Sequence, residues 1–314
     1  MKERNVDPHT LGIATATFYK DWQPLHEGQQ RKHEDVVGIR GDLAMKTLNK
    51  ATEQGFQVTV VDNPESSPAF KAKLDELRES NELYVYQENA ESTMSAGRRQ
   101  ALRETSNFPG VKTIAWIEPE KTSMVDSLLI AAQPIVSGEA HIVVPQRNPE
   151  IFRRTYPDFQ VEYEERANER YNNLLKRTGL RSQEAPPLDA WFGPRLLRND
   201  PKVLEHFMLE HTFAGEERQT FDGINPELWP DTLFLSLPSA LNAGLTVQSV
   251  PVDYYHPAEQ TASENNNPAM EKKRQLQYKT IIFSTAEWLK AKAFDQSEEN
   301  IAAHPSKRSR LRRI

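Results

Sequence analysis

Short apolar segments alternate with helical segments through the first half of this 314-residue chain, and this alternation constrains the fold more than any other feature. The apolar segments are rich in β-branched and aromatic residues and end in polar or turn-forming residues, as buried strands do. They predict strands at residues 11–18, 56–61, 83–86, 111–117 and 141–145. Helical patterns lie between them, at residues 42–53, 67–79, 93–105 and 123–135. Successive βα units of this kind predict an α/β fold with a mostly parallel sheet flanked by helices.

The second half of the chain is less regular. Its helical patterns lie at residues 159–175, 229–244 and 270–294. A late strand is expected at residues 245–252 and a polar loop at 258–267. Residues 189–197, DAWFGPRLL, are a short segment rich in aromatic residues and glycine.

The domain organisation is predicted to be simple, because no internal repeat or clear linker divides the chain. We expect one domain over residues 1–268 and a C-terminal helix over 269–294 that packs on or beside it. Residues 295–314 are expected to form a basic, disordered tail. The long terminal helix is also a surface that could pack against a neighbour in a homo-oligomer.

Composition excludes several classes of protein. The net charge of −6 argues against a general nucleic-acid-binding protein, because neutralising phosphates needs a basic face. No segment approaches the roughly 18 consecutive apolar residues of a membrane span, and no apolar signal core follows the charged N-terminal residues. The chain has no cysteine, which excludes disulfides and thiolate ligands. These features predict a cytoplasmic protein that neither spans a membrane nor binds nucleic acid.

Polar side chains follow almost every predicted strand. In doubly wound parallel sheets the ligand lies beyond the carboxyl ends of the strands, so these side chains are the first candidates for a site. The strand ends carry, in chain order, Phe18-Tyr19, Asp62-Asn63, Gln87-Glu88, Glu118-Pro119-Glu120 and Gln146-Arg147.

The Glu118-Pro119-Glu120 triplet closes an apolar strand. Residues two apart on an extended chain point the same way, so both carboxylates can face one pocket, where Mg²⁺ or Mn²⁺ would offset their repulsion. A solvated turn explains the triplet equally well. His256 follows the late strand among aromatic residues, where it is either a further metal ligand or a hydrogen-bonded structural residue.

Basic residues and helix starts offer places for anions or for an acceptor. Arg98 and Arg99 follow Gly97 near the amino end of a predicted helix, and helix amino ends bind anions. Arg147 lies just past a strand end, and its guanidinium group matches the oxygens of a diphosphate. Solvated surface arginines are the simpler alternative. Asp231 begins a predicted helix, where it either caps the helix or orients an acceptor hydroxyl.

Several short motifs over residues 11–257, taken in order, resemble those of GT-A fold glycosyltransferases. The resemblance is to the family 2-like group that includes mannosylglycerate synthase and glucosyl-3-phosphoglycerate synthase. VTVVDNPESS resembles the strand end that holds the nucleotide, which implies nucleotide contacts from Asp62 and Asn63. Thr15 or Thr17 of the first strand would lie nearby.

Further motifs of the family match later segments. MSAGRRQALRETSN resembles the segment that approaches the nucleotide sugar, which implies contacts from Gly97 and Arg98. IAWIEPEK falls where the family carries its DxD metal motif, so Glu118 and Glu120 would bind Mg²⁺ or Mn²⁺ and the diphosphate. LDAWFGPRLL resembles the loop on the acceptor side, which contains Gly193.

Two more motifs complete the resemblance and imply an activity. WPDTLFLSLPSALNAG resembles the helix that carries an acidic residue, which matches Asp231, and VQSVPVDYYHP matches the metal-binding histidine to His256. The resemblance implies transfer of a hexose from a nucleoside diphosphate sugar to a small soluble acceptor, with Asp231 facing the acceptor or the anomeric carbon. One departure is EPE in place of DxD, which lengthens both carboxylate arms.

Two other hypotheses remain open from the sequence. EPE favours a catalytically silent GT-A domain that binds a nucleotide sugar or a protein partner. A nucleotidyltransferase that makes the activated sugar is the third hypothesis. The absence of a glycine-rich phosphate loop near the first strand weighs against it, and also against kinases and nicotinamide enzymes.

Overall fold

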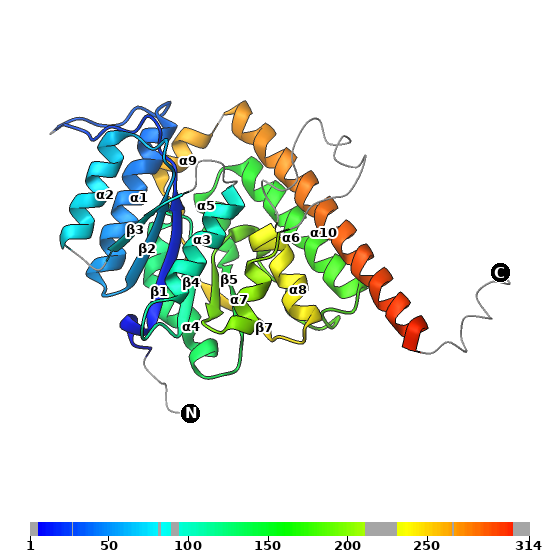
Figure 1. Ribbon diagram of the computed structural model, residues 1–314. Coiled ribbons are helices and arrows are strands. Elements are labelled where there is room, and N and C mark those ends of the chain that lie inside the picture. The colour runs from blue at the N-terminus through cyan, green and yellow to red at the C-terminus, as the bar shows by residue number, and fades with distance from the viewer. Residues whose placement is uncertain are drawn as a thin grey trace.

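The computed structural model describes residues 6–26, 28–80, 83–88, 94–210, 231–265 and 267–303. Its centre is a seven-stranded sheet in the order β3-β2-β1-β4-β6-β5-β7 (Figure 1). The strands are β1 (Leu11–Thr17), β2 (Gln57–Asp62), β3 (Leu83–Gln87), β4 (Thr113–Trp116), β5 (Ile142–Arg147), β6 (Arg195–Arg198) and β7 (Val247–Val252). Among these strands β6 alone runs antiparallel, to both β4 and β5, and the remaining pairings are parallel. The predicted α/β class with a mostly parallel sheet is confirmed.

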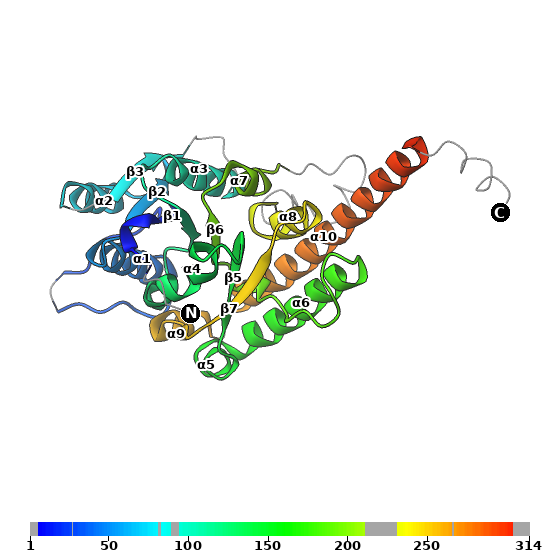
Figure 2. The same cartoon turned by 90° about the horizontal axis from the view of Figure 1, so that it is seen from below.

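Helices cover both faces of the sheet, with α1 and α4 on one face and α3, α7, α8 and α10 on the other (Figure 2). The helices are α1 (Val36–Glu53), α2 (Pro68–Ser80), α3 (Met94–Ser106), α4 (Leu128–Val136), α5 (Pro149–Thr155), α6 (Asp158–Arg177), α7 (Pro201–Phe207), α8 (Ser236–Asn242), α9 (Ala258–Glu264) and α10 (Pro268–Ala303). Short 3-10 segments are η1 (Pro8–Thr10), η2 (Thr122–Ser127) and η3 (Ala190–Phe192), and a π-helical segment is η6 (Asp231–Leu235).

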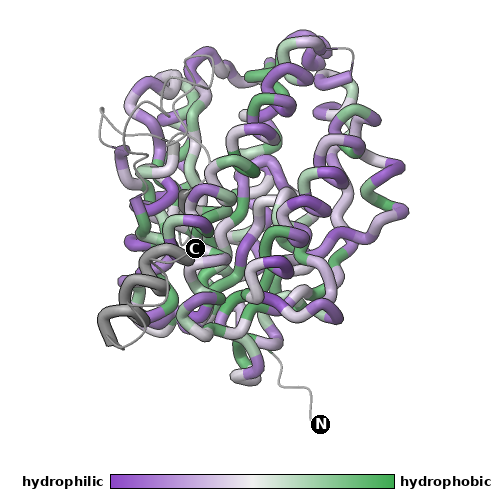
Figure 3. The backbone as a smooth tube through the Cα atoms, turned by 90° about the vertical axis from the view of Figure 1, so that its right-hand side faces the viewer, coloured by the Kyte–Doolittle hydropathy of each residue, from purple (hydrophilic) through white to green (hydrophobic). Residues whose placement is uncertain are grey.

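The alternation of side chains along the central strands builds two cores. Ile13 of β1 packs in one core with Leu48 of α1, and its neighbour Ala14 packs in the other with Leu102 of α3 and Tyr171 of α6. A strand buried on both faces reads as a continuous apolar run, which is why β1 and β2 are recognisable from the sequence. Hydrophobic residues accordingly concentrate in the central strands, and hydrophilic residues predominate on the outer helices (Figure 3).

The C-terminal helix α10 packs along α6. Tyr278 and Ile281 join the core that contains Tyr171, and Trp288 packs with Leu235 of η6. The helix begins at Pro268 and continues to Ala303, beyond the end predicted at residue 294. Residues 304–314, most of the predicted tail, lie outside the described residues.

The segment that contains Gly193 differs most from expectation, because it leads into a strand of the sheet. After η3, residues Arg195–Arg198 form β6, which inserts between β4 and β5. Four residues are too few to display an alternating pattern, and Leu196 and Leu197 are both fully buried because helices cover both faces. The sequence therefore carries no periodic signal for this strand.

Three short helices were also not predicted from the sequence. Asn148-Pro149 begins α5 and Asp200-Pro201 begins α7, and each cap side chain accepts a hydrogen bond from a backbone N–H in the first turn. A cap followed by proline is a recognisable start signal, so the sequence contained the information for both. The predicted loop at 258–267 contains α9, whose buried face is polar and includes Gln260 and Glu264. A polar buried face gives no hydrophobic periodicity.

Within the described part of the chain, every helix is too short or too polar to cross a bilayer. This includes α10, the longest helix, which carries charged residues along its length.

Gly41 of α1 packs against the indole ring of Trp22, which cannot move aside as the end of a flexible side chain can. A Cβ added there would lie 2.2 Å from Cδ1 of Trp22, whose ring nitrogen donates to Asp42 at 2.7 Å. We expect Gly41→Ala to lower the free energy of unfolding by about 1–3 kcal/mol through overpacking. This outweighs the roughly 0.5–1 kcal/mol that alanine gains over glycine inside a helix.

Urea denaturation measures this effect, with Lys46→Ala at an exposed position of the same helix as the control. The control should unfold at the same urea concentration as the wild type or at a slightly higher one. Equal stability of Gly41→Ala and the wild type would contradict the packing of Trp22 against α1.

Candidate active site

The chain adds strands to one side of β1 and then, from β4 onward, to the other side, so a topological switch point lies between the carboxyl ends of β1 and β4. Strands β2 and β3 lie on one side of β1, and β4 lies on the other. In open α/β sheets this switch point is where ligands bind. The Tyr19 hydroxyl, which follows β1, donates to Oε1 of Glu120, which follows β4, at 2.8 Å. Helix α9 and the start of α10 lie at the same end of the sheet (Figure 1). We therefore treat this edge as the candidate site.

Asp62 ends β2 and is fully buried. Its Oδ1 accepts hydrogen bonds from the hydroxyls of Thr17 and Ser66, each at 2.7 Å. Its Oδ2 has no hydrogen-bond partner among the described residues, and neither has the hydroxyl of Thr15 on β1. Burial raises the pKa of the Asp62 carboxyl. The predicted nucleotide contacts Thr15 and Asp62 thus share one edge and retain unused hydrogen-bonding capacity.

Asn63 and Gly97 meet at a third residue, Glu88. The Asn63 side chain donates to Oε2 of Glu88 at 2.7 Å. A Cβ at Gly97 on α3 would lie 2.5 Å from Oε1 of the same carboxylate, so glycine makes room for it. Arg98 turns toward Trp116, with its guanidinium carbon 5.7 Å from the ring centre. The residues predicted to approach the nucleotide sugar therefore border the same edge as Asp62, with Glu88 between them.

Glu118 packs against Gly193, so the segments predicted to carry the metal and the acceptor are in contact. Gly193 has a φ of 100°, and a Cβ there would lie 1.9 Å from Oε1 of Glu118. Oε2 of Glu118 lies 4.0 Å from Nζ of Lys121, and that ammonium group lies over the rings of Phe192 and Tyr254 at 4.9 and 5.2 Å. The positive φ requires glycine at 193, and the Glu118 carboxylate occupies the space that a side chain there would enter.

Glu120 and His256 each have other partners. Glu120 is buried, and besides Tyr19 its Oε1 pairs with Nη2 of Arg40 at 2.6 Å. The His256 ring stacks on Tyr156 with centroids 4.1 Å apart, and its Nε2 lies 3.7 Å from Oε2 of Glu264. Burial lowers the pKa of His256, which favours the neutral ring.

The predicted metal ligands Glu118, Glu120 and His256 are not brought together as a metal site. No three His, Cys, Asp or Glu side chains of the described residues gather closely enough to hold an ion. The Glu120 carboxylate would have to leave a cation and a hydroxyl to bind one. As arranged, the three side chains do not fit a divalent cation, and their role as ligands stays a prediction.

Arg147 has buried partners that differ from its predicted one. Its Nη1 pairs with Glu164 at 2.7 Å, and its Nε and Nη2 donate to the two oxygens of Asp189, each at 2.8 Å. The guanidinium also lies over the Phe152 ring at 3.8 Å. Two carboxylates already neutralise this cation, so its surroundings favour a structural role over a diphosphate contact. The pattern of residues around a strand end could not reveal partners that come from α6 and from the segment before η3.

Asp231 begins the π-helical segment η6, and its side chain lies outside the described residues. Its predicted role on the acceptor side therefore stays a prediction.

Three cations that the sequence motifs did not indicate interact with the buried carboxylates Glu120 and Glu264. They are Arg40 of α1 and Lys273 and Arg274 of α10, and we refer to them as the basic cluster. Burial, followed by the charges of Arg40 and Arg274, lowers the pKa of Lys273 to about 8. The stretch MEKKRQ resembles a solvated helix face, and nothing local to it indicates an interaction with Arg40, Glu120 and Glu264.

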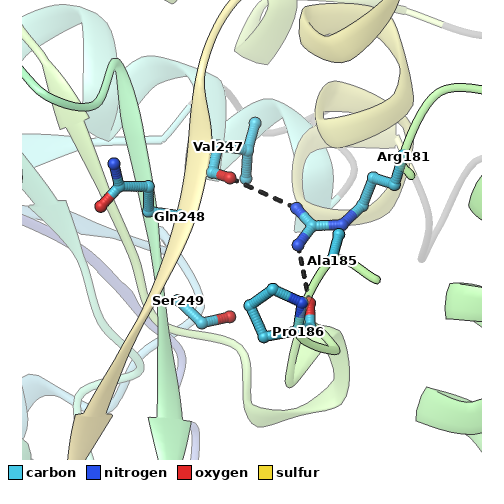
Figure 4. Close-up of a pocket in the computed structure, with 6 residues that line it drawn as sticks. All are labelled: Arg181, Ala185, Pro186, Val247, Gln248 and Ser249. Atoms are coloured by element: carbon cyan, nitrogen blue, oxygen red, sulfur yellow. Dashed lines mark hydrogen bonds between the residues drawn. The ribbon is translucent and has the colours of Figure 1, made fainter. Parts of the chain in front are cut away.

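A pocket of about 360 Å³ lies beside the first residues of β7, at the end of this strand that is remote from the candidate site (Figure 4). Its lining includes Arg181, whose guanidinium donates to the carbonyls of Pro186 at 2.7 Å and Val247 at 3.3 Å. Val247 begins β7, whereas His256 follows its other end. No residue of the predicted site lines this pocket.

We expect Lys273→Met to raise the free energy of unfolding at pH 7 by about 1–3 kcal/mol, because burial disfavours the ammonium group. The folded-state pKa of about 8 lies below the unfolded value of about 10.4, so the folded protein carries the full cost below pH 8. Between pH 8 and about 10.4 the free energy of unfolding of the wild type rises as Lys273 loses its proton. Above about pH 10.4 the wild type and Lys273→Met should therefore be equally stable.

Urea denaturation at pH 7, 9 and 10.5 measures the difference. Lys272→Met, at the exposed neighbouring position, is the matched control and should show no such dependence on pH. A destabilised Lys273→Met variant at pH 7 would mean that the ammonium group is well solvated or well paired.

No protein-family model matches the sequence, and no curated protein matches it. Several solved structures are similar in fold. One is mannosyl-3-phosphoglycerate synthase from Rubrobacter xylanophilus, with 11% identity, a TM-score of 0.47, and coverage of 91% of this chain and 75% of that one. Another is 4-diphosphocytidyl-2C-methyl-D-erythritol synthase from Anaerococcus prevotii, with 9% identity, a TM-score of 0.43, and coverage of 90% and 99%.

A third similar structure is a fragment of TarS from S. aureus, with 14% identity, a TM-score of 0.40, and coverage of 85% of this chain and 69% of that one. At these identities and TM-scores the likeness is one of fold alone.

Proposed function

We propose that this chain is a glycosyltransferase that moves a hexose from a nucleoside diphosphate sugar to a small soluble acceptor in the cytoplasm. The proposal rests on one observation. Asp62, Glu118 and Gly193, which the sequence matches to donor, metal and acceptor segments of GT-A glycosyltransferases, border a single sheet edge at the switch point. Tyr19 connects them, because it bonds to Glu120 and is close enough to Asp62 for the carboxylate to raise its pKa, after the larger effects of burial and Glu120.

In this proposal one group of residues at the edge binds the donor and another binds the acceptor. The Asp62 carboxylate accepts hydrogen bonds from the nucleoside through its unused oxygen, and Gly97 lets the sugar come close to α3. Asp231 faces the acceptor. The negative charge that develops on the leaving diphosphate needs nearby positive charge, which oriented side chains can supply. Because the described carboxylates do not fit a divalent cation as arranged, no step is assigned to Mg²⁺ or Mn²⁺.

A second candidate function is a silent GT-A domain that binds a nucleotide sugar or a protein partner without transfer. The engagement of Glu120 by Arg40 and Tyr19 favours it, because an acidic motif held by a cation and a hydroxyl is less available to a reacting ligand. The two functions differ in one observable, the release of nucleoside diphosphate from a bound donor.

We expect one nucleoside diphosphate sugar from a panel to raise the melting temperature, because a ligand that binds only the folded state stabilises it. Asp62→Asn should weaken that donor at least tenfold, because the amide replaces an acceptor oxygen with a donor. The variant keeps one acceptor for Thr17 and Ser66, so its fold should survive. The matched control is Asp75→Asn, at an exposed position on α2.

The outcomes separate the candidates. Binding together with release of nucleoside diphosphate supports the transferase, and binding without release supports the silent domain. If no nucleotide sugar changes the melting temperature, both the transferase and a silent GT-A domain that binds a nucleotide sugar are excluded.

A further inference from the structure

The acidic motif at the switch point faces side-chain cations. Glu120 accepts from Arg40 at 2.6 Å, and Glu118 lies 4.0 Å from Lys121. Each carboxylate expected to hold a metal ion therefore already has a positive side chain beside it. The positive charge at this edge is built into the chain.

The basic cluster concentrates that charge where α1, α9 and α10 meet. Arg40 comes from the first turns of α1, and Lys273 and Arg274 come from the first turns of α10. Glu120 and Glu264 are the carboxylates that act on Lys273, so three positive groups meet two negative ones. The cluster therefore carries an excess of positive charge at neutral pH.

We propose that the basic cluster of Arg40, Lys273 and Arg274 is a binding site for a diphosphate group that works without a divalent cation. The proposal deepens the proposed function, since it rests on it for the identity of the ligand as a nucleoside diphosphate. The cluster takes the place that the metal ion holds in the resembled glycosyltransferases.

Three features of the cluster suit a diphosphate. The Arg40 side chain is 36% exposed, so a ligand can reach it, while Glu120 holds it in position. The Nε groups of Arg40 and Arg274 are buried without a hydrogen-bond partner among the described residues, so the chain itself does not fully satisfy either guanidinium group. Guanidinium groups bind phosphate oxygens in pairs, and an ammonium group adds a point charge.

The location also suits the ligand. Arg40 reaches Glu120 at the end of β4, beside Tyr19 at the end of β1. A diphosphate held there would be near the Asp62 edge, where the nucleoside is expected. By contrast, Arg147 has two carboxylates of its own and belongs to a different, neutralised group.

The test is isothermal titration with inorganic pyrophosphate in a buffer that contains EDTA. We expect binding to the wild type, at least tenfold weaker binding to Lys273→Met, and binding to Lys272→Met within threefold of the wild type. Both variants remove one positive charge from neighbouring positions of α10, so they differ in place and not in net charge. Arg274→Gln is a second variant that should also lose at least tenfold, and far-UV circular dichroism checks the fold of each.

Several results would overturn the site. These are binding that requires Mn²⁺ and disappears in EDTA, equal losses in Lys272→Met and Lys273→Met, or no binding of pyrophosphate at all. A nucleoside diphosphate that binds more tightly than pyrophosphate, with the same dependence on Lys273, identifies a nucleotide as the ligand. Equal affinities identify the free diphosphate, and either result supports the cluster.

The failure of this site is distinguishable from the failure of the transferase. Donor turnover that occurs only with Mn²⁺ would leave the proposed function standing and refute the metal-free site. Pyrophosphate binding in EDTA that depends on Lys273, without binding of any nucleotide sugar, would support the metal-free site and refute the proposed transferase.

Discussion

The bonds of Glu120 to Tyr19 and Arg40 are the interaction on which the candidate site depends. They join the ends of β1 and β4, the two strands between which the sheet reverses its order, to the first turns of α1. A carboxylate this deeply buried is tolerated only when it is paired, and removing Arg40 would leave an uncompensated charge. The same pairing directs the EPE motif toward a side-chain cation. The geometry of the edge and its charge therefore have one origin.

Much of the fold was predictable because its strongest signals are local. The central strands are buried on both faces and read as apolar runs, and Gly55 and the Asp62-Asn63-Pro64 turn bound β2. The strand β6 was not predictable, because four buried residues have no period. The polar buried face of α9 likewise has no hydrophobic pattern. What was missed depends on contacts that are distant in sequence.

The candidate site divides in the same way. Residues at strand ends, such as Asp62 and Glu118, could be predicted to share an edge because a parallel sheet brings its carboxyl ends together. Arg40, Lys273 and Arg274 were not predicted because they come from helix surfaces that look solvated, and their charges interact only in the folded chain. The partners of Arg147 on α6 and near η3 were hidden for the same reason. Sequence motifs located the edge, and tertiary packing determines which charges act there.

The most direct test of the account is a crystal structure of the chain with a nucleoside diphosphate, grown without divalent cations. The account predicts the diphosphate between Arg40 and the first turns of α10, with the nucleoside toward Asp62. A nucleoside diphosphate bound elsewhere on the chain, or one that enters this edge only with a metal ion on Glu118 or Glu120, would contradict it.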